Sequence, residues 1–170
     1  MSVLSPEDFT AALPAGGRLM GLDLGTRTIG VALADAGWRI ASPYGTIARR
    51  RLAADLEALR AIAAEQQVAG LVIGHPVGMD GTPGKRAQAT RAFARDARTL
   101  GLPILLWDER LSTAEAERAM LEQDVSRAKR AARIDAHAAT IILQAAIDAL
   151  AGMVGLPEQA DGQDRPEHSP

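Results

Sequence analysis

The chain has 170 residues, 47% of them apolar, and a formal net charge of −2, which suits one soluble domain with its own core. It contains no cysteine, so disulfides, thiolate metal sites and cysteine nucleophiles are excluded. We expect no contact with a membrane, because no apolar run is long enough to span a bilayer and the N-terminus lacks the basic-then-apolar pattern of a signal peptide. These features predict a cytoplasmic protein.

The positive charge of the chain is clustered. Acidic residues near both ends hide a small excess of Lys and Arg in the body, and most of these cations fall into three groups, at 49–51, 85–98 and 127–133. Clusters of this kind bind phosphates more strongly than the net charge suggests. The alternative is that many of these side chains only solvate helix faces.

The first third of the chain predicts an antiparallel meander. Residues 1–17 are expected to form a flexible lead-in, because a short amphipathic piece is followed by Pro14-Ala15-Gly16-Gly17. Apolar runs predict strands over 18–24 and 28–35, joined by a turn at Gly25-Thr26-Arg27. A third segment, 38–47, contains Pro43 and is therefore expected to be an edge strand or to bend at the proline.

The remainder of the chain alternates between helical and strand patterns. Helical spacing begins after Arg51, and Ser112 with Glu115 has the spacing of a capping box, which predicts another helix there. The other predictions are strands over 68–74 and 104–107, helices over 84–100 and 132–150, a flexible connector over 122–131 and a disordered acidic tail over 152–170.

This order of elements predicts an α/β domain over residues 18–151. Its sheet should be mixed and five-stranded, with three antiparallel strands followed by parallel ones, and helices should cover both faces.

Two of the predicted strands end in acids, Asp23 in one case and the pair Asp108-Glu109 in the other. Because the carboxyl ends of parallel strands meet at one edge of a sheet, these acids should converge. Asp135 is expected near the start of the last helix, where the helix dipole favours a carboxylate. Such a cluster persists only with cations, and oxygen ligands favour Mg²⁺ or Mn²⁺.

Two such ions, about 3.5–4 Å apart, can activate a water and stabilise the leaving oxygen in phosphodiester cleavage. The sequence therefore predicts a metal-dependent phosphodiester hydrolase. Plainer roles stay open, since Asp108 and Glu109 could pair with Arg110, and Asp135 could be an ordinary first-turn acid. His75, in the loop after the fourth strand, is the better histidine candidate for touching substrate.

Four motifs together resemble the YqgF (RuvX) family. They are Gly21-Leu22-Asp23-Leu24-Gly25, Gly74-His75-Pro76 with Asp80-Gly81, Asp108 to Thr113, and Asp135 followed by Ala138-Ala139. The resemblance covers residues 18–150. It implies a ribonuclease H-like fold related to Holliday-junction resolvases, and a bacterial cytoplasmic nuclease that processes the 5′ end of precursor 16S ribosomal RNA.

The resemblance also implies catalytic acids at Asp23, within Asp108-Glu109 and at Asp135. Adjacent strand residues face opposite ways, so we expect one acid of the doublet to bind metal directly, and we favour Glu109. The metal ligands would then be Asp23, Glu109 and Asp135.

The sequence departs from the family pattern at Thr28, where Arg is common, at His75, where Leu is usual, and at Gly78, where a polar residue is usual. Phosphate contact by the first turn would then depend on Arg27. Further substrate contacts are expected from His75 and Arg110, and from three cations at or just after the connector that could close on a phosphate backbone: Lys129, Arg130 and Arg133.

Other functions compete with an rRNA nuclease. Asp23-Leu24-Gly25-Thr26 also resembles the phosphate-binding hairpin of actin-like ATPases and sugar kinases, but those proteins pair two such domains and this chain has room for one. Cleavage of branched DNA would need two symmetric active sites, hence a stable dimer, whereas the sequence predicts a monomer or weak homodimer. A non-catalytic nucleic-acid-binding module is the third alternative.

Few aromatic side chains are available to stack on bases, since the sequence holds only five. Selective recognition of a single strand is therefore poorly supported. Specificity would come from RNA shape or from the ribosomal precursor particle.

Overall fold

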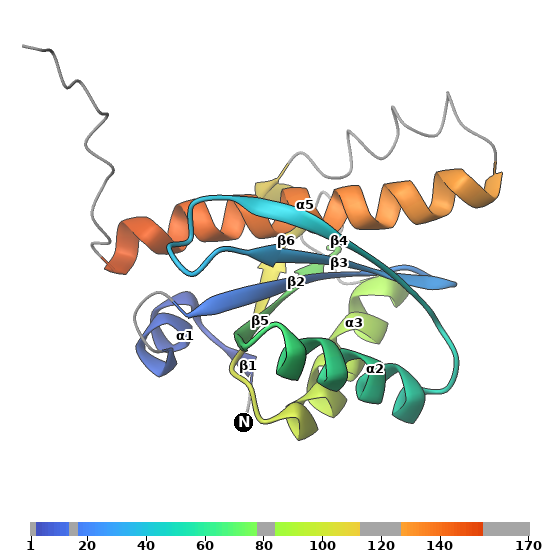
Figure 1. The fold of residues 1–170 in the computed structure, drawn as a ribbon, viewed down its shortest axis with the longest axis horizontal. Helices are drawn as coiled ribbons and strands as arrows, with labels where there is room; N and C mark the ends of the chain where they lie inside the picture. Colours follow the sequence, from blue (N-terminus) through green and yellow to red (C-terminus); the bar gives the residue numbers. More distant parts are fainter. Residues whose placement is uncertain (1–2, 14–16, 78–83, 113–126, 155–170) are drawn as a thin grey trace, which may run out of the picture.

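The computed structural model describes residues 3–13, 17–77, 84–112 and 127–154, with side chains described over the same ranges except 127–135 and 154. Its centre is a six-stranded sheet with the strand order β1-β6-β5-β2-β3-β4. Figure 1 shows α5 along one face of this sheet and α2 and α3 along the other. The predicted placing of helices on both faces is confirmed.

The strands are β1 (Val3–Leu4), β2 (Arg18–Leu24), β3 (Thr28–Ala34), β4 (Ala41–Ala48), β5 (Val68–His75) and β6 (Ile104–Asp108). The α-helices are α1 (Pro6–Ala12), α2 (Leu52–Glu65), α3 (Lys85–Asp96) and α5 (Arg127–Val154), and the 3-10 helices are η1 (Ala97–Leu100) and η2 (Glu109–Leu111). β2, β3 and β4 are antiparallel, whereas β5 and β6 continue the sheet in parallel from β2. The predicted mixed sheet is confirmed, with β1 added as a sixth strand.

Successive residues of the central strands point into two separate cores, as the two-residue period of a strand requires. In β2, Leu19 belongs to the core beneath α5, whereas Met20 and Leu22 belong to the core that α2 and α3 cover. Both faces of β2 are therefore buried, which explains its nearly continuous apolar run.

The N-terminal segment differs from the flexible lead-in expected over 1–17. β1 pairs in parallel with β6, and Phe9 of α1 is fully buried in the same core as α5. Gly70 of β5 leaves the space for this packing, because a Cβ there would lie 3.0 Å from the Phe9 ring and 2.9 Å from the Leu13 side chain. The amphipathic piece is thus part of the core.

The last helix is longer than predicted. α5 begins at Arg127 and ends at Val154, so the second half of the expected connector is helical. The first half of the connector, the helix expected after Ser112 and most of the expected tail lie outside the described residues.

α5 also contains an 18-residue stretch, Ala136–Met153, with mean hydropathy 1.4, which is long and apolar enough to cross a membrane by those two measures. Our expectation that the chain contains no apolar run long enough to span a bilayer is therefore wrong for this stretch of α5. In the fold the apolar stripe packs on β2, β3 and β4. Core packing explains its composition through the buried residues Ala138, Ala139, Ile142, Leu143, Ala146, Ile147 and Leu150.

The sheet has β1 at one edge and β4 at the other. The register between β3 and β4 shifts next to Pro43, which lies opposite Ala32, and this confirms the edge strand predicted from the proline. Gln144 of α5 holds the start of β4 in place through two hydrogen bonds. Its Nε2 donates to the Arg39 carbonyl at 3.1 Å, and its Oε1 accepts from the Ala41 backbone N–H at 2.9 Å.

Gly21 marks the close approach of β2 to α5. A Cβ at this position would lie 2.7 Å from Leu143 Cβ and 3.2 Å from the Ala139 carbonyl oxygen. We expect Gly21→Ala to lower the free energy of unfolding by about 1–3 kcal/mol, because the helix must move to relieve the overpacking. Urea unfolding followed by circular dichroism measures the change.

The matched control is Gly152→Ala in α5, where nothing lies within 4 Å of the added Cβ. This change should leave stability unaltered or raise it by up to about 1 kcal/mol, since alanine is the better helix former. A Gly21→Ala protein as stable as wild type would contradict the close contact.

Candidate active site

The carboxyl ends of β2, β5 and β6 lie at one edge of the sheet. Leu22 of β2 pairs with Ile73 of β5, and Gly74 of β5 pairs with Trp107 of β6. Asp23, which follows Leu22, therefore lies beside Gly74. Figure 1 places the start of α3 and the N-terminal part of α5 on this same side of the molecule.

Asp23 is fully buried. Strand alternation puts its side chain on the same face as Leu19 and Gly21, beneath α5. Its neighbours across the sheet are glycines, Gly30 opposite on β3 and Gly74 on β5, so no neighbouring side chain on the two flanking strands crowds it. A carboxylate in this position is costly to desolvate unless charge or hydrogen bonds compensate it.

Glu109 is 3% exposed and lies on the same face as Asp23. Its carboxylate occupies the space that a side chain at position 74 would fill. A Cβ on Gly74 would lie 2.8 Å from Glu109 Oε1 and 2.6 Å from Ile142 Cδ1 of α5. The glycine thus allows the carboxylate to lie over β5, next to β2 and Asp23.

The turn η2 orients Glu109. Asp108 Oδ1 accepts a hydrogen bond from the Arg110 backbone N–H at 2.9 Å and so caps the turn. At the other end, Ser112 Oγ donates to the Glu109 carbonyl at 3.0 Å. The tight turn directs the Glu109 side chain inward while its neighbour stays near the surface.

Asp108 has a different environment from Glu109. Arg110 Nη2 lies 2.6 Å from Asp108 Oδ2, and Arg110 Nε donates to both carboxylate oxygens at 3.0 Å. The side-chain hydrogen bonds from Arg110 lower the pKa of Asp108. The pairing that the sequence left open therefore applies to Asp108, and the structure separates the two acids of the doublet.

Asp135 lies within α5, and its side chain is outside the described part of the chain. Its backbone lies one turn before Ala139, which contacts the Gly21 position. Since α5 runs antiparallel to β2 (Figure 1), one helical turn, about 5.4 Å, matches two strand residues, about 6 to 7 Å. The Asp135 backbone is thus level with Asp23.

The reason we gave for Asp135 from the sequence is wrong. α5 begins at Arg127, so Asp135 is eight residues into the helix, whereas the influence of the dipole fades within the first turn. The nearness of its backbone to the level of Asp23 follows from its position relative to β2, not from the helix end.

The donor types at this edge fit a hard divalent cation. Asp23 and Glu109 offer carboxylate oxygens, which Mg²⁺ and Mn²⁺ prefer, and Gly74 leaves room for the second of them. Within the side chains that the structure describes, no group of three His, Asp or Glu could hold a metal ion. Of the three expected metal ligands, Asp23 and Glu109 have described side chains, whereas that of Asp135 is outside the described part of the chain.

The expected substrate contacts lie at different places around the site. Arg27 is exposed at the β2–β3 turn, and Arg110 pairs with Asp108. His75 lies opposite Asp108 in the sheet, and its buried Nε2 has no hydrogen-bond partner among the described residues. The backbones of the other three belong to α5, while their side chains are not described: Lys129, Arg130 and Arg133.

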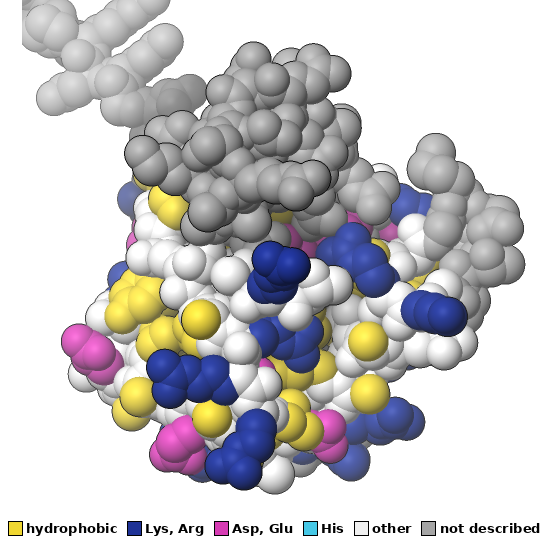
Figure 2. All heavy atoms as spheres, turned by 90° about the vertical axis from the view of Figure 1, so that its right-hand side faces the viewer, with side chains coloured by type: hydrophobic (Ala, Val, Ile, Leu, Met, Phe, Trp, Pro, Cys, Tyr) yellow, Lys and Arg dark blue, Asp and Glu magenta, His cyan; other side chains and the backbone are white. Residues whose placement is uncertain are grey.

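Two arginines that were not among the individually expected substrate contacts lie against the β2–β3 turn. Arg49 Nη1 donates to the Gly25 carbonyl at 2.8 Å, and Arg86 Nη2 lies 3.4 Å from the Leu24 carbonyl oxygen. Both belong to the basic clusters noted above, but their meeting depends on how β4 and α3 pack, which no local pattern encodes. Figure 2 shows many Lys and Arg side chains on this face of the molecule.

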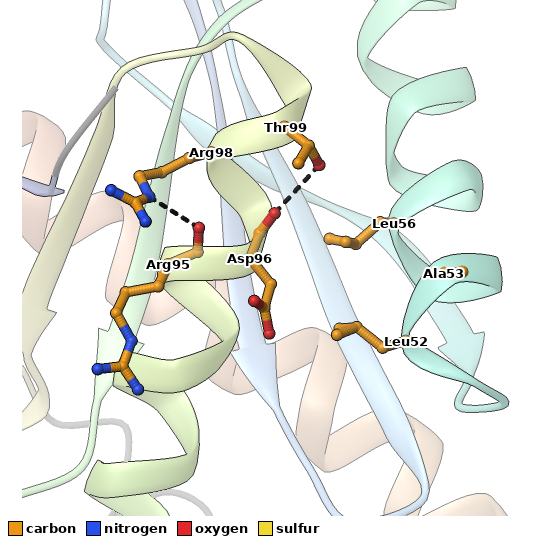
Figure 3. Close-up of a pocket in the computed structure, with 7 residues that line it drawn as sticks. All are labelled: Leu52, Ala53, Leu56, Arg95, Asp96, Arg98 and Thr99. Atoms are coloured by element: carbon orange, nitrogen blue, oxygen red, sulfur yellow. Dashed lines mark hydrogen bonds between the residues drawn. The ribbon is translucent and has the colours of Figure 1, made fainter.

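A surface hollow of about 630 Å³ lies between α2 and the end of α3 (Figure 3). Leu52 and Leu56 form its α2 wall, and Arg95 and Arg98 lie on the other. Arg98 Nε donates to the Arg95 carbonyl at 2.9 Å. The hollow contains none of the acids at the strand ends, so the chemistry inferred from the sequence is not located there.

The order of the strands, with acids at the ends of β2 and β6 beneath a long helix, defines a ribonuclease H-like protein. A solved structure, "T. thermophilus RuvC in complex with Holliday junction substrate", shares this fold with a TM-score of 0.51 at 12% identity. The match covers 82% of this chain and 97% of that one.

The sequence comparisons give the family. The family model RuvX, described as Holliday junction resolvase, matches residues 17–149. A relative from Sphingopyxis alaskensis, named "Putative pre-16S rRNA nuclease", is 63% identical over 88% of this chain and 99% of its own length. One of the same name from Rhodobacter capsulatus is 58% identical over 85% and 92%. The chain belongs to the RuvX family, which confirms the resemblance.

His75 should make stability depend on pH. Burial lowers its pKa, Arg91 lowers it further, and Asp108 acts in the opposite direction. The unfolded chain therefore binds this proton more readily than the folded one, so the free energy of unfolding falls as pH drops through about 6.5. We expect His75→Gln to remove part of that fall, measured by urea unfolding between pH 8 and 5.

His137→Gln is the matched control, since His137 is exposed on α5. If His75→Gln and wild type lose the same stability between pH 8 and 5, the half-buried His75 makes no such contribution.

Proposed function

We propose that this protein is a metal-dependent nuclease of the cytoplasm that hydrolyses phosphodiester bonds and processes the 5′ end of precursor 16S rRNA. The observation that carries the proposal is the burial of Asp23 and Glu109 on one face of the sheet, over adjacent strands and beneath α5. Two ionised carboxylates so placed repel each other, and a cation bound between them would compensate that repulsion.

In this proposal Asp23, Glu109 and Asp135 hold Mg²⁺ or Mn²⁺. The bound metal would activate water and neutralise charge on the phosphate that is cut. β2 fixes Asp23 within a rigid strand, and η2 fixes Glu109 against Gly74. Asp108 is then a positioning residue, because it caps η2 and binds Arg110.

The choice of substrate has two sources of support. The names of the Sphingopyxis and Rhodobacter relatives favour precursor 16S rRNA, on its own or within a ribosomal precursor particle. The description of the RuvX family model favours branched DNA instead. Resolving a junction requires two symmetric active sites, so a branched-DNA substrate would need a stable dimer. We propose instead a monomer or weak homodimer that acts on RNA.

The direct test is cleavage of labelled precursor 16S RNA, a generic single strand and a four-way DNA junction, with Mg²⁺, Mn²⁺ or EDTA. We expect metal-dependent cutting of the precursor. Asp23→Asn, Glu109→Gln and Asp135→Asn should each lower the rate by more than about 100-fold, because each removes a metal ligand. Asp108→Asn, the matched control in the same turn, should lower it by about 10-fold, as changes behind a metal ligand do.

The other outcomes also decide the matter. Cutting of the junction in place of the precursor would assign the protein to recombination. Equal losses for Asp108→Asn and Glu109→Gln would contradict the separate roles of the two acids. If nothing is cut while all variants bind nucleic acid as wild type does, the isolated chain is a binding module and the catalytic proposal fails.

A further inference from the structure

A small recess lies beside the β2–β3 turn, at the same end of β2 as the buried Asp23. The turn residues Leu24 to Thr26 form one wall, and Arg49 after β4 with Arg86 and Thr90 of α3 form the other. Its volume is about 70 Å³, whereas pockets that enclose drug-sized ligands have about 300 Å³ or more. The recess therefore suits a group as small as a phosphate, not a nucleoside.

Arg49 is held in place at two points. Its Nη1 donates to the Gly25 carbonyl at 2.8 Å, and its Nε lies 3.9 Å from Asp55 Oδ2. Asp55 is buried and also accepts from the Arg50 backbone N–H at 2.9 Å. A guanidinium has five N–H donors, so these contacts orient Arg49 and leave donors for a ligand.

Arg86 completes the positive side of the recess. It lies in the first turn of α3, which contains no acid, and its contact with the Leu24 carbonyl is long, at 3.4 Å. Among the ion pairs formed by described residues, none includes Arg86. The recess thus has two guanidinium groups, while its walls carry no carboxylate.

The recess and the acids lie on opposite faces of the same strand end. Asp23 faces α5, and the next residue, Leu24, faces α2 and α3. Gly25 follows directly and contacts Arg49. A nucleic-acid strand that crosses the end of β2 would therefore meet the acids with one phosphate and the arginines with another.

We infer that this recess is a phosphate subsite, in which Arg49 and Arg86 bind a backbone phosphate next to the one that is cut. The identity of the strand rests on the proposed nuclease function. Guanidinium groups bind phosphate oxygens in bidentate fashion, and a phosphate contact fixes register without selecting sequence. The subsite shifts the phosphate contact expected for the first turn from Arg27 to two arginines outside that turn.

The test measures binding rather than cleavage. The probe is a fluorescein-labelled synthetic segment of the precursor RNA that spans the cut site, bound by the Asp23→Asn protein with and without Arg86→Ala. We expect Arg86→Ala to weaken binding by about 10-fold. The slope of log affinity against log salt should become shallower by about 0.7, the loss of one phosphate contact on a single strand.

Arg98→Ala is the matched control. It removes the same charge from η1, beyond the other end of α3, and should leave the salt slope unchanged. Urea unfolding of both variants checks that each is folded. Equal effects of Arg86→Ala and Arg98→Ala would overturn the subsite, because both would then report only general charge.

A second measurement locates the phosphate. Each phosphate of the probe is replaced in turn by a neutral methylphosphonate. The Asp23→Asn protein should lose affinity most at one linkage near the cut site. Adding Arg86→Ala should make the loss at that linkage smaller, because only Arg49 then remains to bind the phosphate and two changes to one contact are not additive. Additive losses at every linkage would overturn the proposal.

The two proposals fail separately. If the wild-type chain cuts no substrate but Arg86→Ala shows this pattern, the phosphate subsite stands and the nuclease function falls. If the precursor is cut but Arg86→Ala binds like Arg98→Ala, the nuclease stands and the subsite falls.

Discussion

The burial of two carboxylates on one face of the sheet is the constraint on which the rest of the site depends. An ionised carboxylate loses several kcal/mol of hydration when water is removed, and two on one face also repel each other. The surrounding residues fit this requirement. Glycines flank Asp23 on both neighbouring strands, and the Glu109 carboxylate occupies the space that a side chain at Gly74 would fill.

α5 closes this face, and its distance from the sheet is set by small residues. Gly21 lets the helix approach β2, and Gly74 allows Ile142 and Glu109 to share one space. The same packing that stabilises the domain therefore determines how far the helix lies from the acids. Stability and the geometry of the site are coupled through α5.

Much of the fold follows from local patterns in the sequence. The bounds of β2 and the buried run of β5 were predicted because apolar residues there form uninterrupted runs. β1 was missed, since two residues carry no periodicity. The start of α5 was placed too late, because its first turns are polar and basic, as a solvated loop would be.

The sequence predicted which residues belong to the candidate site better than it predicted how they are arranged. Strand ends and the family resemblance pointed to Asp23 and to the doublet, but which acid of the doublet faces inward depends on η2, a single turn fixed by hydrogen bonds from Arg110 and Ser112. The contact of Arg86 with β2 joins segments 62 positions apart in sequence. Contacts of this kind arise from tertiary packing, which a sequence pattern does not contain.

The two borders of the sheet also limit how copies of this protein can associate. β1 is only two residues long, and β4 contains Pro43, which has no N–H to donate, next to a shift of register. Neither border offers the long, flat row of unpaired backbone groups onto which a strand from another molecule can add. Both borders are therefore poor templates for strand addition, and we expect two molecules to pair through helices or loops instead.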